Sequence, residues 1–178
     1  NGLGIGLLDY MVKGQVDSET GDFLPDFGIE NDEDKFYKKY KTENTETDAI
    51  YVIKANMPIN TEAHSYVQTQ LSSGKIKFLI DESQAKVKLL GTKIGQTMDP
   101  EKRSEYLKPF VETTILREQM LNLIEDNEGV NIILKMANRG VGKDKFSAFE
   151  YALYYIKQEE DSRKKKRGRK ISDFMFFS

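Results

Sequence analysis

The chain has 178 residues, of which 38% are hydrophobic and 31% are charged, so it suits one domain with a single core and a densely charged surface. It contains no cysteine, which excludes disulfides and thiolate metal sites. Its one histidine, His64, argues against a polyhistidine metal site and a serine triad, so Asp and Glu are the candidate catalytic groups. No stretch reaches the roughly 20 apolar residues that span a bilayer, and no signal peptide is visible, so we expect neither a membrane nor a secreted protein.

The first residues predict a glycine-rich turn that leads into a short helix. Gly2, Gly4 and Gly6 precede an apolar run that stops at Gly14, which predicts a helix over residues 4–13. The glycines lack the spacing and the lysine of a phosphate-binding loop, so a tight strand-to-helix turn is the simpler interpretation. Because the strand before such a turn and an initiating methionine are missing, we expect the chain to be cut from a longer protein.

The middle of the chain predicts a loop followed by strands and a helix. Residues 15–48 are rich in turn-forming and charged residues and should hold no core strand. Residues 49–55 form a continuous apolar, β-branched run that is typical of a buried strand. A helix capped by Asn60 should run to about Ser72, and an alternating strand should follow over residues 75–80.

The second half continues the alternation of strands and helices. We predict helices over residues 81–90 and 108–125, a strand over residues 130–136, and a last helix that starts at Asp144. The buried face of this last helix should be formed by Phe146, Phe149, Leu153 and Ile156. Strands that alternate with helices indicate an α/β fold.

Asp144 is the carboxylate best placed for chemistry. It stands where a loop meets an amphipathic helix, so it could cap the helix or, with carboxylates from neighbouring strands, bind Mg²⁺ or Mn²⁺. Lys143 and Lys145 flank it and could contact phosphates or simply face solvent. His64 lies in the middle of a predicted helix and should be a surface or packing residue. The glutamates of the long helix should face water, namely Glu112, Glu118 and Glu125.

The charge is distributed unevenly along the chain. Residues 163–170 contain seven of the 27 basic residues and no acidic one, whereas the rest of the chain is net acidic. Such a run could bind DNA phosphates with an affinity that falls as salt rises, or could only keep the protein soluble. Its basic residues are Arg163, Lys164, Lys165, Lys166, Arg167, Arg169 and Lys170. We therefore predict a domain over residues 1–160 and a basic tail with an apolar end over residues 161–178.

Four segments carry a resemblance to a known family. They are Asn1-Gly2-x-Gly4-x-Gly6-Leu7-Leu8-Asp9, then Lys75-Ile76-Lys77-Phe78, then Pro109-Phe110 with Leu116-Arg117-Glu118-Gln119-Met120, and finally Lys143-Asp144-Lys145-Phe146-Ser147-Ala148-Phe149-Glu150-Tyr151-Ala152. In this order they are spread over most of the chain, from residue 1 to residue 152, and resemble the carboxy-terminal nuclease domain of the large terminase subunit of tailed bacteriophages. The fourth segment, with its helix, is the most specific.

The resemblance implies a fold and an activity. The family has a ribonuclease H-like fold, with a mixed sheet flanked by helices. It is an endonuclease that cuts concatemeric double-stranded viral DNA with two divalent ions, Mg²⁺ or Mn²⁺, while the genome is packaged into procapsids. Asp144 would be the late carboxylate of its catalytic metal cluster. The two earlier carboxylates would lie before Asn1, so we expect a domain that is incomplete at its amino terminus and inactive alone, with Asp9 as the nearest substitute ligand.

The resemblance also implies partners and a location. Double-stranded DNA, a portal and a small terminase subunit would be the partners, no membrane would be involved, and the cytoplasm of the infected bacterial host would be the location. Two other interpretations stay open, namely a non-enzymatic DNA- and portal-binding module of a packaging complex, and a transposase or resolvase of the same fold. The nuclease needs carboxylates upstream of Asn1, whereas the module needs none.

Overall fold

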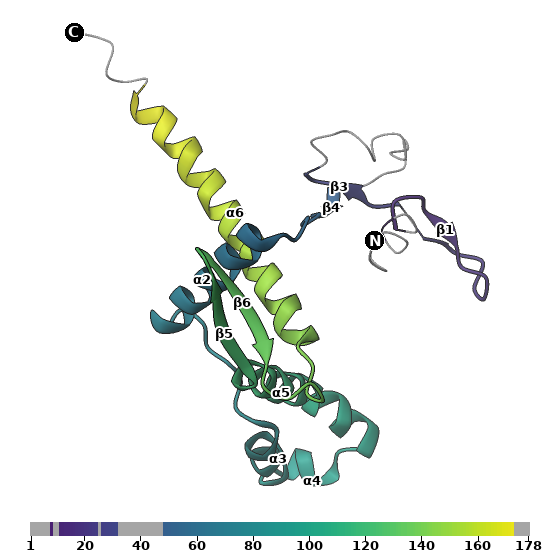
Figure 1. The fold of residues 1–178 in the computed structure, drawn as a ribbon. Helices are drawn as coiled ribbons and strands as arrows, with labels where there is room; N and C mark the ends of the chain where they lie inside the picture. Colours follow the sequence, from purple (N-terminus) through teal and green to yellow (C-terminus); the bar gives the residue numbers. More distant parts are fainter. Residues whose placement is uncertain (1–7, 9–10, 25, 32–47, 173–178) are drawn as a thin grey trace. The chain divides into compact units, whose positions relative to one another are not determined.

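The computed structural model describes residues 8, 11–24, 26–31 and 48–172, which Figure 1 draws as a coloured ribbon. The chain divides into two compact units, Asn1–Lys54 and Ala55–Ser178. Most of the predicted first helix lies outside the described residues.

The described residues of the first unit form four short strands in two separate pairs. β1 (Gln15–Val16) pairs antiparallel with β2 (Phe23–Leu24), and β3 (Gly28–Ile29) pairs in parallel with β4 (Asp48–Ile50). β1, β2 and β3 therefore lie in a segment that the sequence predicts to contain no core strand.

β4 is much shorter than the strand predicted over residues 49–55. The Asn31 side chain binds the backbone of Val52 twice, because its Nδ2 donates to the Val52 carbonyl at 2.7 Å and its Oδ1 accepts from the Val52 N–H at 2.8 Å. The Asn31 side chain satisfies the N–H and C=O of one residue but cannot continue a backbone ladder, so the pairing of β3 with β4 ends near Val52.

α2 (Met57–Ser72) starts the second unit. Its N-cap is Asn56, whose side chain accepts a hydrogen bond from the Ile59 N–H at 2.9 Å. The predicted cap at Asn60 is wrong because Pro58 favours the first helical turn, which moves the start towards Asn56.

Residues 75–80 form neither a helix nor a strand, so the strand predicted there is wrong. A strand needs a backbone partner, and the described part of the chain offers this segment none. Phe78 is held by a side chain instead, since its ring packs against that of Phe149 with centroids 5.9 Å apart.

Three helices follow, α3 (Glu82–Leu90), α4 (Lys93–Thr97) and α5 (Pro100–Leu121). α3 confirms the predicted helix, and Asp81 caps it by accepting from the Gln84 N–H at 2.9 Å. α5 begins and ends before the helix predicted over residues 108–125, because Asp99 caps it and Pro100 occupies its first turn. The buried side chains that join α3 to α5 are Ala85, Leu89 and Leu107.

β5 (Leu123–Glu128) and β6 (Asn131–Met136) form an antiparallel hairpin. Gly129 stands in its turn with a φ of 64°, in the left-handed region that favours glycine. β6 confirms the predicted strand, whereas the helical prediction for the start of β5 is wrong. The reason is Asn122, whose side chain exchanges two 2.8 Å hydrogen bonds with the backbone of Asn138 and so joins the end of α5 to the exit of the hairpin.

α6 (Asp144–Ser172) starts at the predicted residue and includes residues 161–172, which the sequence assigns to a tail. Its first half packs on α2, and α2 also packs on β6, so these elements lie side by side (Figure 1). The buried stripe of α6 is Phe146, Glu150 and Tyr154, at the four-residue spacing of one helix face. The predicted member Ile156 is 46% exposed, and a carboxylate stands in the middle of the stripe.

The chain is therefore a mixed α/β protein, in which the described residues form three separate two-stranded sheets. Among these residues, no helix has both the length and the apolar character that crossing a membrane requires.

Candidate functional site at the start of α6

Asp144 is the first residue of α6, and its side chain is exposed. The Lys143 carbonyl accepts the first helical hydrogen bond, from the Ser147 N–H at 2.9 Å, so Lys143 occupies the N-cap position. Within the described residues, the Asp144 carboxylate makes no hydrogen bond and no ion pair. Both of its oxygens are therefore accessible to an external ligand.

The first turn of α6 is capped from another helix. Gln119 of α5 is only 6% exposed, and its Oε1 accepts from the Lys145 N–H at 2.9 Å and from the Phe146 N–H at 3.1 Å. Two of the amides that a helix start leaves without a partner are thus satisfied by this one oxygen. Gln119 consequently fixes the position of the turn that carries Asp144, although it is far from Asp144 in the sequence.

The two lysines beside Asp144 differ in their surroundings. The Lys145 ammonium forms an ion pair with the Glu112 carboxylate of α5. Lys143 is half-buried and forms no ion pair with any described residue. Lys143 is therefore the lysine with its charge available to an anion. Glu112, which is predicted to face water, is nearly half exposed and also pairs with Lys145.

His64 of α2 lies between two carboxylates, those of Glu125 and Glu150. We call these three side chains the histidine clasp. The His64 Nε2 is 2.9 Å from Glu125 Oε1 of β5, and its Nδ1 is 3.4 Å from Glu150 Oε1 of α6. The second contact is an ion-pair distance without the alignment of a hydrogen bond, since neither of these buried atoms has a hydrogen-bond partner. Gln68 also donates to Glu125 Oε1. The clasp joins three elements at one imidazole.

The histidine clasp is buried and electrostatically unbalanced. His64 is 8% exposed and Glu150 is 6% exposed, whereas nearly half of the Glu125 side chain is exposed. Burial of the ring lowers the pKa of His64, but its contacts with Glu150 and Glu125 outweigh this effect and raise the pKa above the ordinary value of 6.5. His64 is buried, which fits the packing role among its predicted surface or packing roles, and it also contacts two carboxylates. Glu125 is exposed to water as predicted, and it also contacts His64.

A second contact between α2 and α6 lies further along both helices, and we call it the lysine clasp. Lys157 Nζ is 2.7 Å from Glu62 Oε1 of α2 and 2.8 Å from Asp161 Oδ2 of α6. Its hydrogen bonds to Asp161 and Glu62 raise the pKa of Lys157 well above its usual range, so it stays charged at every pH of interest. Both carboxylates are more than a third exposed.

A metal centre is not complete within the described residues, because no three of their metal-binding side chains converge. Asp144 supplies one carboxylate, and Asp9 lies outside the described residues. Two divalent ions do not fit this donor set, since each needs several oxygen ligands. Any such centre would take its remaining ligands from elsewhere.

The basic end of α6 is partly described. Arg163 contacts Glu159 at 3.7 Å and Lys164 contacts Asp161 at 3.5 Å, which are exposed pairs within one helix. Lys165 is exposed and forms no ion pair with a described residue. The predicted DNA-binding side chains that lie outside the description are Lys166, Arg167, Arg169 and Lys170.

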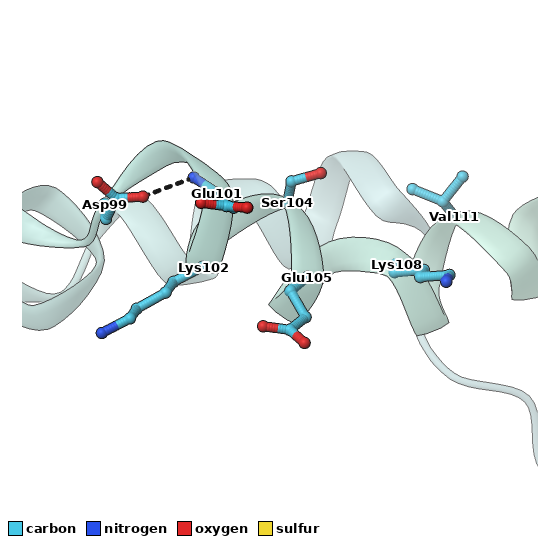
Figure 2. Close-up of a pocket in the computed structure, with 7 residues that line it drawn as sticks. All are labelled: Asp99, Glu101, Lys102, Ser104, Glu105, Lys108 and Val111. Carbon is cyan, nitrogen blue, oxygen red and sulfur yellow. Dashed lines mark hydrogen bonds between the residues drawn. The ribbon is translucent and has the colours of Figure 1, made fainter. Parts of the chain in front are cut away.

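A depression follows the first half of α5 (Figure 2). The carboxylate of Asp99 accepts from the Glu101 N–H at 2.9 Å, as the dashed line in Figure 2 shows, and therefore serves as a helix cap. The other side chains that line it mix both charges and come from α5 alone, namely Lys102, Ser104, Glu105, Lys108 and Val111. It is a stretch of helix surface, and its composition indicates no chemistry.

No protein-family model, curated protein or solved structure matches the chain significantly. The start of α6 therefore has to be interpreted from its own contacts. Two groups there escape sequence reasoning, the cap Gln119 and the buried pair of His64 and Glu150. The available signal is Glu150 itself, a carboxylate four residues from Phe146 and from Tyr154, on the apolar stripe of a helix.

Proposed function

We propose that this chain belongs to the ribonuclease H-like nuclease domain of a phage large terminase subunit, a metal-dependent DNA endonuclease in which Asp144 is one of the metal-binding carboxylates. The observation that carries the proposal is that the Asp144 carboxylate is exposed and makes no hydrogen bond or ion pair among the described residues, although its charge in the first turn also suits the helix dipole. Gln119 provides the cap of α6, and within the described residues Asp144 has no partner. The four-segment sequence resemblance supplies the family.

The surroundings of Asp144 are consistent with this role. A hard cation such as Mg²⁺ or Mn²⁺ prefers carboxylate oxygens, and Asp144 offers two that are exposed. Lys143 is adjacent and available to a phosphate, which would help to bind DNA. The further ligands required for two ions are proposed to come from outside the described residues. Concatemeric double-stranded DNA, a portal and a small subunit are proposed partners in the cytoplasm of the infected host.

A second candidate is a non-enzymatic DNA- and portal-binding module. Two observations favour it, since the described residues contain no complete metal-binding group and the exposed Lys165 lies in the basic end of α6 without an ion-pair partner among them. Such a module would bind duplex DNA through phosphates, with an affinity that falls steeply as salt is added.

The test is Mn²⁺-dependent nicking of supercoiled plasmid by the protein expressed from its complete reading frame. We expect Asp144→Asn to lose on the order of a hundredfold or more in rate, because a carboxylate ligand is removed while its shape is kept. Glu101→Gln is the matched control, since Glu101 is an exposed acidic residue in the first turn of α5 and should leave the rate unchanged. Circular dichroism checks that both variants fold.

Each outcome decides between the candidates. Loss of nicking in Asp144→Asn alone supports the nuclease. Equal nicking by both variants and the unaltered protein removes Asp144 from the site. If the unaltered protein does not cut but retains salt-sensitive DNA binding, the binding module replaces the nuclease.

A further inference from the structure

The starting observation is a carboxylate in the middle of an apolar helix face. Glu150 is 6% exposed and lies between Phe146 and Tyr154 on the stripe that α6 buries. A buried carboxylate is costly unless a cation or hydrogen-bond donors compensate it. Among the described residues, the only cationic group within 4.0 Å of Glu150 is the imidazole of His64 when it is protonated.

We propose that protonated His64 is a positioning residue, which holds the first two turns of α6, and with them Asp144, by joining Glu150 of α6 to Glu125 of β5. The role of Asp144 in this statement rests on the proposed nuclease function. The clasp itself, which closes when His64 is protonated and loosens when His64 loses its proton, does not depend on the proposed nuclease function.

The geometry connects the clasp to the start of α6. The His64 ring contacts Phe146 edge-on, with centroids 6.2 Å apart at 66°, and also contacts Glu150 one turn further on. Phe146 is 2% exposed, and its N–H is held by Gln119. His64 therefore contacts the buried side of the turn whose exposed side presents Asp144.

The charges around the imidazole set the direction of the effect. α6 presents Glu150 to the ring and β5 presents Glu125, while β6, the third element of this packing, presents no titratable group to it within the described residues. Protonated His64 balances one of two carboxylates, whereas neutral His64 leaves Glu150 buried without a counter-charge. The clasp should therefore be closed below about pH 6.5 and loosen as the pH rises through the higher pKa of the folded protein.

The direct test is an NMR titration, because His64 is the only histidine of this chain and its imidazole signals need no assignment. We expect a folded-state pKa above 6.5, which Glu150→Gln lowers. Lys157→Met is the matched control, since it removes a cation from the same pair of helices and should leave the His64 titration unchanged. A pKa at or below 6.5, or one that Glu150→Gln does not lower, overturns the proposal.

The positioning itself is measured by hydrogen–deuterium exchange of peptides over residues 144–154 in the complete protein. After correction for intrinsic exchange, protection in the unaltered protein should fall by roughly threefold to tenfold between about pH 6 and about pH 8. The His64→Gln and Glu150→Gln variants should lack this slope, and Lys157→Met should retain it. The same slope in all four proteins rules out the clasp.

The two proposals fail separately. A pH-dependent exchange slope without Asp144-dependent nicking leaves the clasp and removes the nuclease. Asp144-dependent nicking without the slope leaves the nuclease and removes the clasp. If both hold, the nicking rate of the unaltered protein should fall relative to Glu150→Gln over the pH range in which the clasp loosens.

Discussion

The two clasps between α2 and α6 use similar groups in different surroundings. In the lysine clasp, Lys157 bridges Glu62 and Asp161, whose side chains are 46% and 40% exposed. In the histidine clasp, the imidazole and Glu150 are both almost completely buried. The exposed clasp carries a permanent charge that solvent screens, and the buried clasp carries a charge that can be lost near neutral pH.

The difference shows that burial, more than the number of contacts, determines what an ion pair does. Solvent can replace either partner of the lysine clasp, so removing it costs little. In the histidine clasp no other described residue can replace the imidazole beside Glu150, so removing His64 leaves the Glu150 carboxylate buried without a counter-charge. The contact between α2 and α6 therefore combines the lysine clasp, which is insensitive to pH near neutrality, with the histidine clasp, which is sensitive to it.

The largest effect is expected from His64→Ala, which should lower the free energy of unfolding by about 3 kcal/mol at mildly acidic pH because a buried carboxylate loses its counter-charge. Urea denaturation followed by circular dichroism measures it. Since the pKa of His64 is raised in the folded state, its contribution is full below about pH 6.5 and is lost as the pH rises, so the deficit should shrink above neutrality.

The double variant His64→Leu with Glu150→Leu sharpens this prediction. Replacing a buried ion pair by apolar residues is often close to neutral, so the double variant should recover most of the lost stability. If it is no more stable than His64→Ala, the loss comes from packing and not from a stranded charge.

A smaller effect is expected from Gln119→Ala. The variant leaves the Lys145 and Phe146 amides without their acceptor, which should cost about 1–2 kcal/mol in urea denaturation, as for the loss of a helix cap. Gln119→Glu keeps an acceptor at the same place and should retain most of the stability. An unchanged denaturation midpoint in the alanine variant would show that the cap is dispensable.

The smallest effect is expected from Lys157→Met, at about 0.5–1 kcal/mol, because both acidic partners remain hydrated. This loss should be the same across neutral pH and should decrease as salt is added. A loss as large as that of His64→Ala, or one that depends on pH near neutrality, would remove the contrast between the two clasps.

The sequence predicts the elements whose signals are local. Asp81 before an amphipathic run and Asp144 after a glycine loop mark the starts of α3 and α6, and the run over residues 130–136 marks β6. The strand predicted over residues 75–80 and most of the one over residues 49–55 are wrong, because pairing depends on a partner that no local pattern reveals.

The site divides in the same manner. Asp144 can be selected from its position in the sequence, and its exposure fits a ligand-binding role. The roles of Gln119 and Glu150 cannot be predicted in this way, because they depend on contacts between residues far apart in the sequence. Gln119 caps a different helix, and the counter-charge of Glu150 is His64 on a different helix. His64 is an interior titratable group for the same reason, since its partners are contributed by β5 and α6.

The cap provided by Gln119 has a consequence for cooperativity. A helix whose first amides are bound by its own cap can form and melt by itself, but the start of α6 requires the end of α5 to be in place. The last turn of α5 and the first turn of α6 should consequently open together, as one subglobal unfolding unit. Any ligand that orders one of them would thereby protect the other from local opening.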